Sequence, residues 1–448
     1  MKKYDLIVIG TGVAGLTAAH TCREAGLTVA VIDKLPFGGT CALRACDPKK
    51  VLLGAAEIMD RVNRMNGLGI EEGSRVRWED LMNFKRTFTK GFSENNEKGY
   101  LSAGIDTYHG VASFTSESEI IINDVKLAFN HLLIASGAKP APLHIEGEEF
   151  VVLSDDFLEL EHLPKRVVFI GGGFISFEFA HLTALAGSEV HILHRNRTPL
   201  KNFDQDLVSL LVKRTEELGI HLHLNTEPTK IEKIEDRYIV HVVENGKDME
   251  IECDMVFHGA GRIPDVEDLD LEKGKVAQDK RGITVNEFLQ SVSNEKVYSA
   301  GDSAASKGLP FTSVATRESP VVAENILKGN LKQLDYSLVP SIVFTQPKLA
   351  MIGLTEAKAV DKGYEITVNR FDTTGWYTYK RTHEAVAMTK TITDKKTGKL
   401  IGVHILGSNA DELINYFALI MKFDLPYEEV KNMFFAYPTS ASDIEYFI

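Results

Sequence analysis

Two of the four cysteines in this 448-residue chain, Cys41 and Cys46, lie five positions apart in the segment GGTCALRACDPK. A pair of thiols can form and break a disulfide and thereby carry two electrons. On a regular α-helix, residues five apart point about 140° away from each other, with α-carbons beyond the roughly 7 Å that a disulfide spans. A bridge therefore requires a break in the helix, which the Gly-Gly before the pair and Pro48 after it favour. Taken alone, the pair fits either a redox centre with a thiolate at a helix start or two buried, inert thiols.

A dinucleotide-binding motif precedes the cysteine pair. The apolar run LIVI at 6–9 leads into GTGVAG at 10–15, then a helical stretch to about residue 25, and then a second apolar run that ends at Asp33. This is the G-x-G-x-x-G motif in its strand–turn–helix–strand context. Its glycines let a pyrophosphate approach the backbone, and the Asp33 carboxylate can accept hydrogen bonds from ribose hydroxyls. Next to such a motif, redox chemistry at the cysteines is strongly favoured over inert thiols.

The same unit recurs 161 residues later in the chain. VVFI at 167–170 leads into GGGFIS at 171–176, and the second strand ends at His194, where the first copy has Asp33. Two such units imply two nucleotides. We expect one to be a tightly held flavin dinucleotide and the other an exchanging nicotinamide dinucleotide.

The end of the second strand indicates which nicotinamide cofactor binds. Residues 194–197 read His-Arg-Asn-Arg, with no carboxylate at the strand end. Arginines bind a 2′-phosphate that a carboxylate would repel, and each charge-assisted hydrogen bond contributes roughly 1.5–3 kcal/mol. We therefore predict a preference for NADPH over NADH through His194, Arg195 and Arg197. The alternative interpretation is that these arginines are solvated surface residues.

Composition sets the broad class of protein. Hydrophobic residues make up 44 % and charged residues 25 %, which is typical of a chain with sizeable cores, and the length suggests about three domains. The net charge of −13 argues against nucleic acid or an anionic membrane surface as a partner. No apolar run reaches the roughly 18 residues of a membrane span, and Asp5 interrupts a possible signal peptide. Four cysteines are too few for an extracellular disulfide framework, so we expect a cytoplasmic protein.

Together these motifs resemble the class I pyridine nucleotide-disulfide oxidoreductases, the family of glutathione reductase, dihydrolipoamide dehydrogenase and mercuric reductase. The cysteine segment matches the family pattern G-G-T-C-x4-C-x-P-x-K, with Ala45 in place of a glycine that is usual before the second cysteine. Further similar segments follow in the family's order: ASG at 135–137, GAGRIP at 259–264, YSAGD at 298–302 and PSIVFTQP at 340–347. The resemblance covers essentially the whole chain and points to the mercuric-reductase-like branch.

The resemblance implies a role for each matched residue. Cys46 would exchange electrons with the flavin, and Cys41 would attack the substrate. Lys50 and Glu178 would form an ion pair near the reactive flavin nitrogen, although both could instead be ordinary charges on helix surfaces. Phe174 stands where many relatives have a tyrosine that covers the nicotinamide pocket. The cofactor-binding candidates are Gly10, Gly12, Gly15, Asp33, Gly39, Thr40, Lys50, Ser136, Gly137, Asp302, Gly171, Gly173, Phe174, Ile175, Glu178, His194, Arg195, Arg197 and Gly261.

The C-terminal segment departs from the disulfide-reducing members of the family. YPTSAS at 437–442 stands where those members have His-Pro-Thr-x-x-Glu, contributed by the partner subunit. Tyr437 replaces the acid–base histidine, Ser442 replaces the glutamate that orients it, and Asp443 lies one position late. A tyrosine, with an ordinary pKa of about 10, is a poor proton shuttle, and loss of a general acid slows a reaction by about two to four orders of magnitude. We therefore expect slow turnover of glutathione disulfide and dihydrolipoamide.

The positions of the cysteines distinguish between branches of this family. Tyrosine at this C-terminal position is seen in mercuric reductases and in soluble transhydrogenases, but the transhydrogenases lose the second cysteine that this chain keeps. Mercuric reductases carry a further C-terminal cysteine pair, whereas the last cysteine here is Cys253, so dedicated mercury detoxification is not expected. Cys22 and Cys253 are interpreted as small core residues. A lone C-x4-C would be an incomplete zinc site, so no structural metal is predicted.

We therefore expect an α/β fold with two Rossmann-like dinucleotide-binding domains, one inserted into the other, and a C-terminal α+β dimerisation domain. The FAD domain would comprise residues 1–147 and 267–335, the NAD(P)H domain 148–266, and the dimerisation domain 336–448. The active site would be shared across a homodimer, because Tyr437 must reach the partner's cysteines. The leading hypothesis is an NADPH-dependent FAD enzyme that reduces a small disulfide or reactive electrophile through Cys41 and Cys46. The alternatives are reduction of a metal ion such as copper or mercury, and a flavin-bound redox sensor with little turnover.

Overall fold

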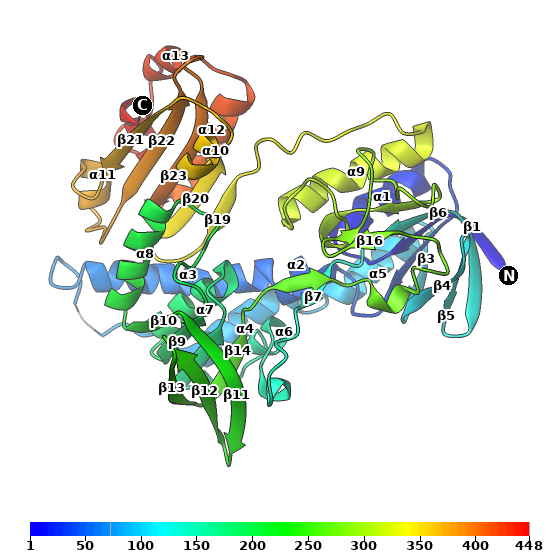
Figure 1. Cartoon of the computed structure of the whole chain (residues 1–448), viewed down its shortest axis with the longest axis horizontal. Coiled ribbons are helices and arrows are strands. Elements are labelled where there is room, and N and C mark those ends of the chain that lie inside the picture. The colour runs from blue at the N-terminus through cyan, green and yellow to red at the C-terminus, as the bar shows by residue number, and fades with distance from the viewer. Residues whose placement is uncertain (72, 448) are drawn as a thin grey trace. The chain divides into compact units, whose positions relative to one another are not determined.

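The computed structural model describes residues 1–71 and 73–447, and tertiary contacts group the chain into two compact units (Figure 1). The first unit comprises Met1–Lys50, Asn83–Ala141 and Arg262–Tyr336. The second comprises Val51–Met82, Pro142–Gly261 and Ser337–Ile448. Each unit is therefore assembled from three segments of chain, and two helices, α3 (Cys46–Arg64) and α4 (Trp78–Thr89), contribute to both.

The first unit is built around a seven-stranded sheet of order β3-β2-β1-β6-β5-β4, with β18 paired to β6. Its central strands are parallel, and LIVI at 6–9 in β1 is buried on both faces, as parallel strands under helices usually are. The bounds are β1 (Lys2–Ile9), β2 (Val29–Asp33), β3 (Asp106–His109), β4 (Ala112–Ser116), β5 (Glu119–Ile122), β6 (Val125–Ile134) and β18 (Val297–Ser299). Because successive side chains alternate, Leu6 and Val8 belong to one core cluster and Ile7 and Ile9 to another.

Helices α1 (Val13–Glu24) and α9 (Thr312–Lys328) lie side by side in the first unit (Figure 1). Both contribute small apolar residues to the same core cluster as Leu6, and the Ser319 hydroxyl accepts a hydrogen bond from the backbone N–H of Ala18 at 3.0 Å. Cys22 is fully buried in this cluster, as predicted, and burial raises its pKa to about 12. The other α-helices and strands that lie wholly in this unit are α2 (Gly39–Arg44), α5 (Phe92–Ser102), β7 (Ala138–Pro140), β15 (Arg262–Pro264), β16 (Gln278–Asp279) and β17 (Gly282–Ile283).

The second unit contains the second nucleotide-binding fold. Four parallel strands follow the order β10-β9-β8-β14, and a three-stranded antiparallel sheet has the order β11-β12-β13. The strand bounds are β8 (Arg166–Ile170), β9 (Glu189–His194), β10 (Ile220–Leu224), β11 (Thr226–Ile234), β12 (Arg237–Glu244), β13 (Lys247–Cys253) and β14 (Met255–His258). The helices are α6 (Ser154–Phe157), α7 (Phe174–Leu185) and α8 (Gln205–Glu217). Helix α7 is apolar on nearly all sides because it is enclosed by the unit's core.

The C-terminal part of the second unit is an antiparallel sheet of order β19-β20-β23-β22-β21 with α12 packed against β20 and β23. Its elements are β19 (Ser341–Val343), β20 (Lys348–Gly353), α10 (Glu356–Asp361), β21 (Ile366–Asp372), α11 (Tyr377–Lys380), β22 (Met388–Asp394), β23 (Leu400–Gly407), α12 (Ala410–Lys422) and α13 (Tyr427–Lys431). Leu349 and Leu406 share one core cluster with Leu207 and Leu211 of α8, so this sheet and the parallel sheet form one compact unit. The predicted α/β class is confirmed, while the three-domain division at residues 147, 266 and 335 stays a prediction.

Among the described residues, no helix combines the length and the apolar character that crossing a membrane requires.

A buried cluster of charges stabilises the second unit. The side chain of Lys390 in β22 is 2 % exposed, and its Nζ lies 2.8 Å from carboxylate oxygens of Asp204, Asp206 and Glu356. Burial lowers the pKa of Lys390, but the hydrogen bonds that its ammonium donates to these carboxylates outweigh it and hold the pKa above its ordinary value. Lys390 is therefore charged, and it compensates the Asp204 carboxylate, whose side chain is 4 % exposed.

Replacing Lys390 by methionine is expected to lower the free energy of unfolding by about 3–5 kcal/mol, because the buried Asp204 carboxylate then has lost its counter-charge. Urea denaturation followed by circular dichroism measures this loss. Lys399→Met is the matched control: the Lys399 side chain is 55 % exposed and pairs with Asp424, so its removal should change stability by at most about 1 kcal/mol. Equal losses in the two variants would contradict this assignment.

Candidate active site

The cysteine pair lies at the junction of two helices in the first unit. Cys41 is in α2, Cys46 is the first residue of α3, and both are half-buried thiols. Ala45 separates the helices with φ −150° and ψ −94°. The helix break that the five-residue spacing requires is therefore present, and it brings the two sulfurs close enough for a hydrogen bond between them.

The two thiols have opposite electrostatic character. The hydrogen bond from Cys41 to Cys46 raises the pKa of Cys41, and burial raises it further. The same hydrogen bond lowers the pKa of Cys46 to about 6, with help from Thr312 and from the charges of Lys49 and Lys50. Its place at the start of α3 adds the favourable end of the helix dipole. At neutral pH the pair is thus a thiolate at Cys46 that accepts a hydrogen bond from the Cys41 thiol.

Thr312, which sequence reasoning missed, belongs to this centre. It begins α9, and its Oγ1 donates to Cys41 Sγ at 3.2 Å and lies 3.5 Å from Cys46 Sγ. Nothing in the sequence connects residue 312 with residues 41 and 46, because the contact exists only after α9 has packed beside α1. Its hydroxyl is a third polar group that stabilises negative charge on the sulfurs.

The rate of Cys46 alkylation is expected to follow the thiolate fraction, with a midpoint near pH 6. Because the pKa is lowered, the thiolate persists above this pH and is lost as the pH falls through it, about tenfold per unit. Iodoacetamide labelling of the reduced protein, read by peptide mass spectrometry, measures the profile. Removal of the hydrogen-bond donor in Cys41→Ala should move the midpoint upward. Cys253, whose pKa burial raises to about 12, is the unreactive internal control, and a midpoint above pH 8 would contradict the assignment.

The glycine-rich turn of the first unit packs directly against the cysteine segment. A Cβ on Gly39 would lie 2.4 Å from Gly12 Cα, and a Cβ on Gly10 would lie 2.2 Å from the Ala135 carbonyl oxygen. Gly10 and Gly39 also have φ of +102° and +75°. Backbone therefore approaches backbone here with no room for side chains on Gly10 and Gly39, as in the glycine-rich turns that hold a pyrophosphate.

A chain of hydrogen bonds joins three of the predicted cofactor-binding segments. The Asp33 carboxylate accepts from the backbone N–H of Thr11 at 2.9 Å and from its hydroxyl at 2.7 Å. The Thr11 hydroxyl oxygen in turn accepts from the backbone N–H of Gly38 at 3.1 Å. Asp33 thus fixes the glycine-rich turn, in addition to the ribose contact predicted for it.

The other candidates of the first unit follow its parallel strands. Gly10 follows β1, Ser136 and Gly137 follow β6, and Asp302 follows β18, so all lie at the carboxyl edge of the sheet where nucleotides bind in such folds. Burial raises the pKa of Asp302, and the charge of Arg262 opposes this. The Ser136 hydroxyl oxygen is buried and has no hydrogen-bond partner within the described part of the chain, which fits a polar ligand at this edge.

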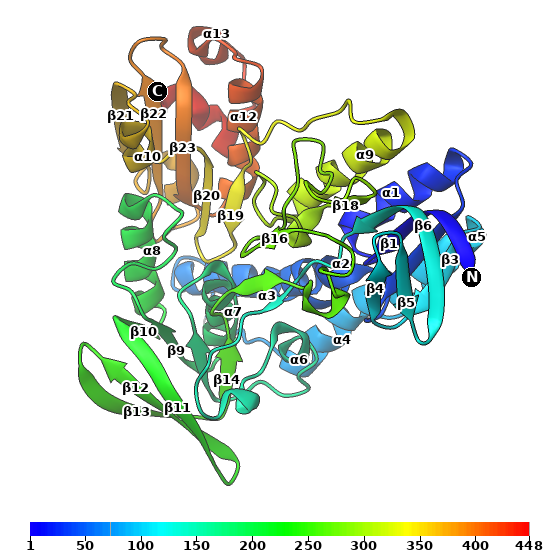
Figure 2. The ribbon, with the colours of Figure 1, turned by 45° about the vertical axis from the view of Figure 1, so that its right-hand side comes forward.

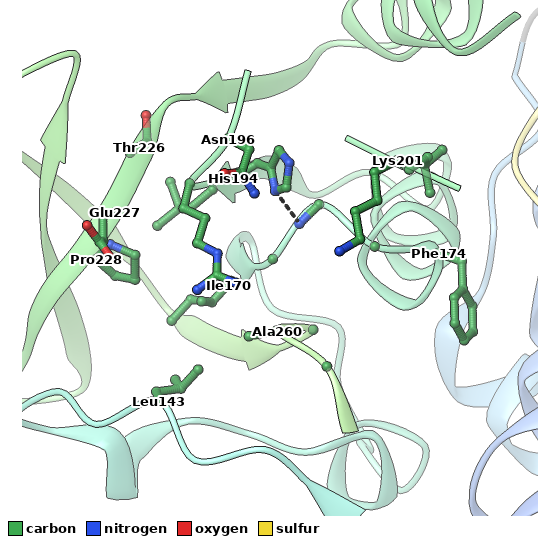
Figure 3. A pocket seen from close by; sticks show the side chains of 18 of the residues that line it. Leu143, Ile170, Phe174, His194, Asn196, Lys201, Thr226, Glu227, Pro228 and Ala260 are labelled. Atoms are coloured by element: carbon green, nitrogen blue, oxygen red, sulfur yellow. Dashed lines mark hydrogen bonds between the residues drawn. The ribbon is translucent and has the colours of Figure 1, made fainter. Parts of the chain in front are cut away.

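The second glycine-rich turn borders a cavity of about 370 Å³ in the second unit (Figure 3). A Cβ on Gly171 would lie 2.3 Å from the Gly259 carbonyl oxygen, so this turn also depends on glycine. The lining combines both predicted and unpredicted residues: Leu143, Ile145, Ile170, Gly171, Gly172, Gly173, Phe174, Leu193, His194, Arg195, Asn196, Leu200, Lys201, Asn202, Phe203, Thr226, Glu227, Pro228, Gly259, Ala260 and Gly261. The cavity thus has the glycine turn on one side and the end of β9 on another.

His194 is a neutral side chain that orders the turn. Its Nε2 lies 2.9 Å from the Thr198 carbonyl oxygen, which can only accept, so Nε2 carries the proton and Nδ1 accepts from the backbone N–H of Gly172 at 3.2 Å. Figure 3 shows this second contact as a dashed line. Burial lowers the pKa of His194, in agreement with a neutral ring. His194 therefore positions the loop and adds no positive charge to it.

The positive charges of the cavity come from Arg195 and Lys201. Arg195 lines the cavity as predicted, whereas Arg197 is exposed and is not among the lining residues. Figure 3 shows the Lys201 side chain reaching into the cavity. The sequence-based prediction of positive charges extended only to residue 197. Lys201 lies four residues further along the same loop and could have been included on its charge.

Helix α7 carries Phe174, Ile175 and Glu178. Phe174 begins the helix and lines the cavity with a side chain that is 43 % exposed. Glu178 is 1 % exposed, and its Oε1 accepts from the backbone N–H of Phe344 at 2.9 Å. Glu178 is therefore a buried carboxylate and no ordinary helix-surface charge. Its pairing with Lys50, a residue of the first unit, stays a prediction.

The segment that replaces the family's histidine and glutamate is exposed at its start. Tyr437 is 80 % exposed. Ser442 is 6 % exposed and forms a capping box with Thr439, in which its backbone N–H donates to Thr439 Oγ1 at 3.3 Å. Burial raises the pKa of Asp443, which lies in the same short helix, residues Ser440–Tyr446. Ser442 is thus committed to local structure, and the Tyr437 hydroxyl is left accessible.

Comparisons with known proteins agree with this arrangement. Residues 4–319 match the family model described as pyridine nucleotide-disulphide oxidoreductase, and residues 339–446 match that of its dimerisation domain. The chain is 32 % identical over 451 residues to a mercuric reductase of Staphylococcus aureus, covering 99 % of this chain and 81 % of that protein. It is 28 % identical to a dihydrolipoyl dehydrogenase of Haloferax volcanii, covering 98 % and 94 % of the two chains. Among solved structures, the Cu(II) complex of the HOCl-induced flavoprotein disulfide reductase RclA from Escherichia coli is similar with a TM-score of 0.89 and 25 % identity, covering 100 % and 99 %.

Proposed function

Because this chain belongs to the pyridine nucleotide-disulphide oxidoreductase family, we propose that it uses NADPH and FAD to reduce a small disulfide or reactive electrophile through Cys41 and Cys46. Members of this family bind FAD and use NAD(P)H, and the dimerisation domain implies a homodimer. The observation that carries the proposal is the thiol–thiolate pair at the helix break, held next to a glycine turn without side chains.

The first unit fits a flavin dinucleotide. Gly10 would shape the turn, Gly12 and Gly39 would hold the pyrophosphate by backbone amides, and Asp33 would accept from the ribose. Ser136 and Asp302 would contact the rest of the molecule at the carboxyl edge of the sheet. When bound, FAD supplies two-electron transfer between a nicotinamide and a disulfide. The cavity of the second unit would bind NADPH, with Arg195 and Lys201 on its 2′-phosphate.

The cysteine pair carries its own proton for the exchange with a disulfide. The Cys46 thiolate takes the Cys41 proton as Cys41 Sγ attacks one sulfur of the acceptor, and this proton then passes to the first leaving thiolate. Cys46 next attacks Cys41 Sγ, which closes the Cys41–Cys46 disulfide and releases the second thiolate. The pair loses two electrons, the acceptor gains them, and the second thiolate takes a proton from solvent. No histidine is needed for the first step, but the second leaving group departs without a general acid.

Acceptors whose thiols leave readily are therefore the best substrates. A leaving thiol of low pKa departs quickly as its thiolate, whereas an aliphatic thiol benefits from the acid that this chain lacks. This favours activated disulfides and electrophiles over glutathione disulfide.

Reduction of a metal ion is the second candidate function. Two adjacent sulfurs, one of them a thiolate, form a soft donor pair suited to copper or mercury. The relatives support it, since one is named mercuric reductase and one similar structure is a Cu(II) complex. In this case the ion would be the substrate, bound directly by Cys41 and Cys46.

Steady-state turnover of the anaerobic flavin-loaded protein tests these functions. NADPH oxidation would be followed with 5,5′-dithiobis(2-nitrobenzoate), glutathione disulfide, Cu²⁺, Hg²⁺ and a quinone. We expect kcat/KM for the aromatic disulfide to exceed that for glutathione disulfide by at least about a hundredfold, the size of a lost general acid. Equal values would contradict the proposed proton balance, a higher value for a metal ion would favour the second function, and no turnover on any acceptor would favour a redox sensor.

A further inference from the structure

Three polar side chains gather on one face of the parallel sheet in the second unit, and none of them lines the cavity. Glu189 and His191 are two positions apart in β9 and so point to the same face. β10 pairs with β9 in parallel with His221 opposite His191. One donor atom from each of Glu189, His191 and His221 lies within 4.8 Å of the other two. Figure 2 shows β9 and β10 beside β11 and β12 of the antiparallel sheet.

Behind His191 lies a relay of hydrogen bonds. His191 Nδ1 is 3.0 Å from His223 Nε2, and His223 Nδ1 is 3.0 Å from Glu244 Oε1. On the other side of the ring, His191 Nε2 is 3.3 Å from Glu189 Oε1. Two imidazoles thus make three contacts in a row, with a carboxylate at each end.

This relay has one hydrogen-bond donor too few for its three contacts. Both carboxylates only accept, and two neutral imidazoles provide two N–H groups for three contacts. If His223 donates to Glu244 and His191 donates to His223, His191 Nε2 is left with a lone pair facing the Glu189 carboxylate. Two acceptors 3.3 Å apart repel each other unless a proton or a metal ion lies between them.

The His191 side chain is 14 % exposed, and the relay through His223 holds its Nδ1. A neutral imidazole held by a second histidine and a carboxylate is the usual form of a metal ligand, because the relay fixes its tautomer and its orientation.

We propose that Glu189, His191 and His221 bind a divalent transition-metal ion, Zn²⁺ or Cu²⁺, with His223 and Glu244 as positioning residues. Two imidazoles and one carboxylate are ligands that both ions accept, and water completes the coordination. The rings of His191 and His221 are stacked with centroids 4.7 Å apart, so one ring must turn to aim at a shared ion. His221 is exposed, and its terminal torsion is soft, so it is the ring that turns.

Metal titration of the flavin-loaded protein tests this site. A Cys41→Ser/Cys46→Ser background keeps the ion away from the redox sulfurs, and calorimetry with Zn²⁺ should then find one site per chain. His191→Ala should weaken binding more than a hundredfold, and His223→Gln by about ten- to a hundredfold through lost orientation. Glu189→Gln removes a ligand at an exposed position, so that weaker Zn²⁺ binding in this variant reports the lost ligand and not a folding defect.

His241→Ala is the matched control. His241 also has two carboxylate neighbours, Glu232 at Nε2 and Glu250 at Nδ1, but on opposite sides of the ring, so they cannot chelate one ion together with it. Zn²⁺ affinity should not change in this variant. With Cu²⁺, electron paramagnetic resonance should show nitrogen coupling that His191→Ala reduces. No Zn²⁺ binding in the parent, or equal binding in the His191→Ala and His241→Ala variants, would overturn the proposal.

Discussion

Cys46→Ser is expected to lower kcat/KM for a disulfide acceptor by at least about a thousandfold, the effect of removing a nucleophile from a group that acts as a unit. The reason lies in the pairing of the two sulfurs. Cys46 is the thiolate that accepts the Cys41 hydrogen bond, and without it Cys41 has neither its base nor the partner that closes the disulfide. A serine hydroxyl replaces neither function, because it stays protonated and cannot form a disulfide.

Anaerobic titration with NADPH separates this loss from a failure to bind cofactors. The Cys46→Ser protein should keep its bound flavin and take up one NADPH equivalent fewer than the parent, because one two-electron centre is gone. Cys253→Ala is the matched control, since Cys253 is fully buried in the second unit and takes no part in the exchange. Full activity of Cys46→Ser with a disulfide acceptor would rule out the dithiol mechanism.

The double variant Arg195→Ala/Arg197→Ala is expected to reduce the preference for NADPH over NADH by about one to two orders of magnitude. This range corresponds to one charge-assisted hydrogen bond of roughly 1.5–3 kcal/mol, because Arg195 is the arginine of the two that lines the cavity. Since Arg195 lines the cavity and Arg197 does not, Arg195→Ala alone should produce most of the change. The loss should appear in kcat/KM for NADPH, with kcat/KM for NADH little altered, because only NADPH carries the 2′-phosphate.

Initial rates with both cofactors measure this ratio for each variant. Lys213→Ala is the control, since Lys213 is an exposed base on α8 that does not line the cavity, and general loss of positive charge should not change the ratio. Adding Lys201→Ala to Arg195→Ala tests the lysine that sequence reasoning missed and should reduce the ratio further. Equal efficiency of the parent with NADPH and NADH would remove the basis for the predicted preference.

The features of the site that are local in sequence could be predicted. Both glycine turns, the strand ends at Asp33 and His194, and the helix break between the cysteines follow from spacing and backbone sterics. The α/β class follows from the repeated strand–turn–helix–strand unit. These features depend on residues within about thirty positions of one another, where periodicity and glycine placement carry the information.

The features that depend on tertiary packing could not be predicted. Thr312 is more than 260 residues from the cysteines in the chain. It contacts them only because α9 packs beside α1. His194 was expected to belong to a basic run, but its neutral ring accepts from Gly172 because its other nitrogen is engaged by Thr198. The sequence-based expectation of no structural metal considered the cysteines alone. The juxtaposition of β9 and β10 that brings His191 to His221 depends on strand register.

The close approach of Gly12 and Gly39 has a consequence for protein engineering. Since Gly39 has no room for a side chain against Gly12 and the Asp33–Thr11–Gly38 hydrogen bonds span the same contact, the nucleotide turn and the cysteine segment form a single transplantable module. Exchanging the cysteine segment alone between two reductases of this kind would mismatch the contact, whereas residues 6–50 exchanged together would keep it intact. Chimeras that vary the acceptor should therefore be cut outside this module.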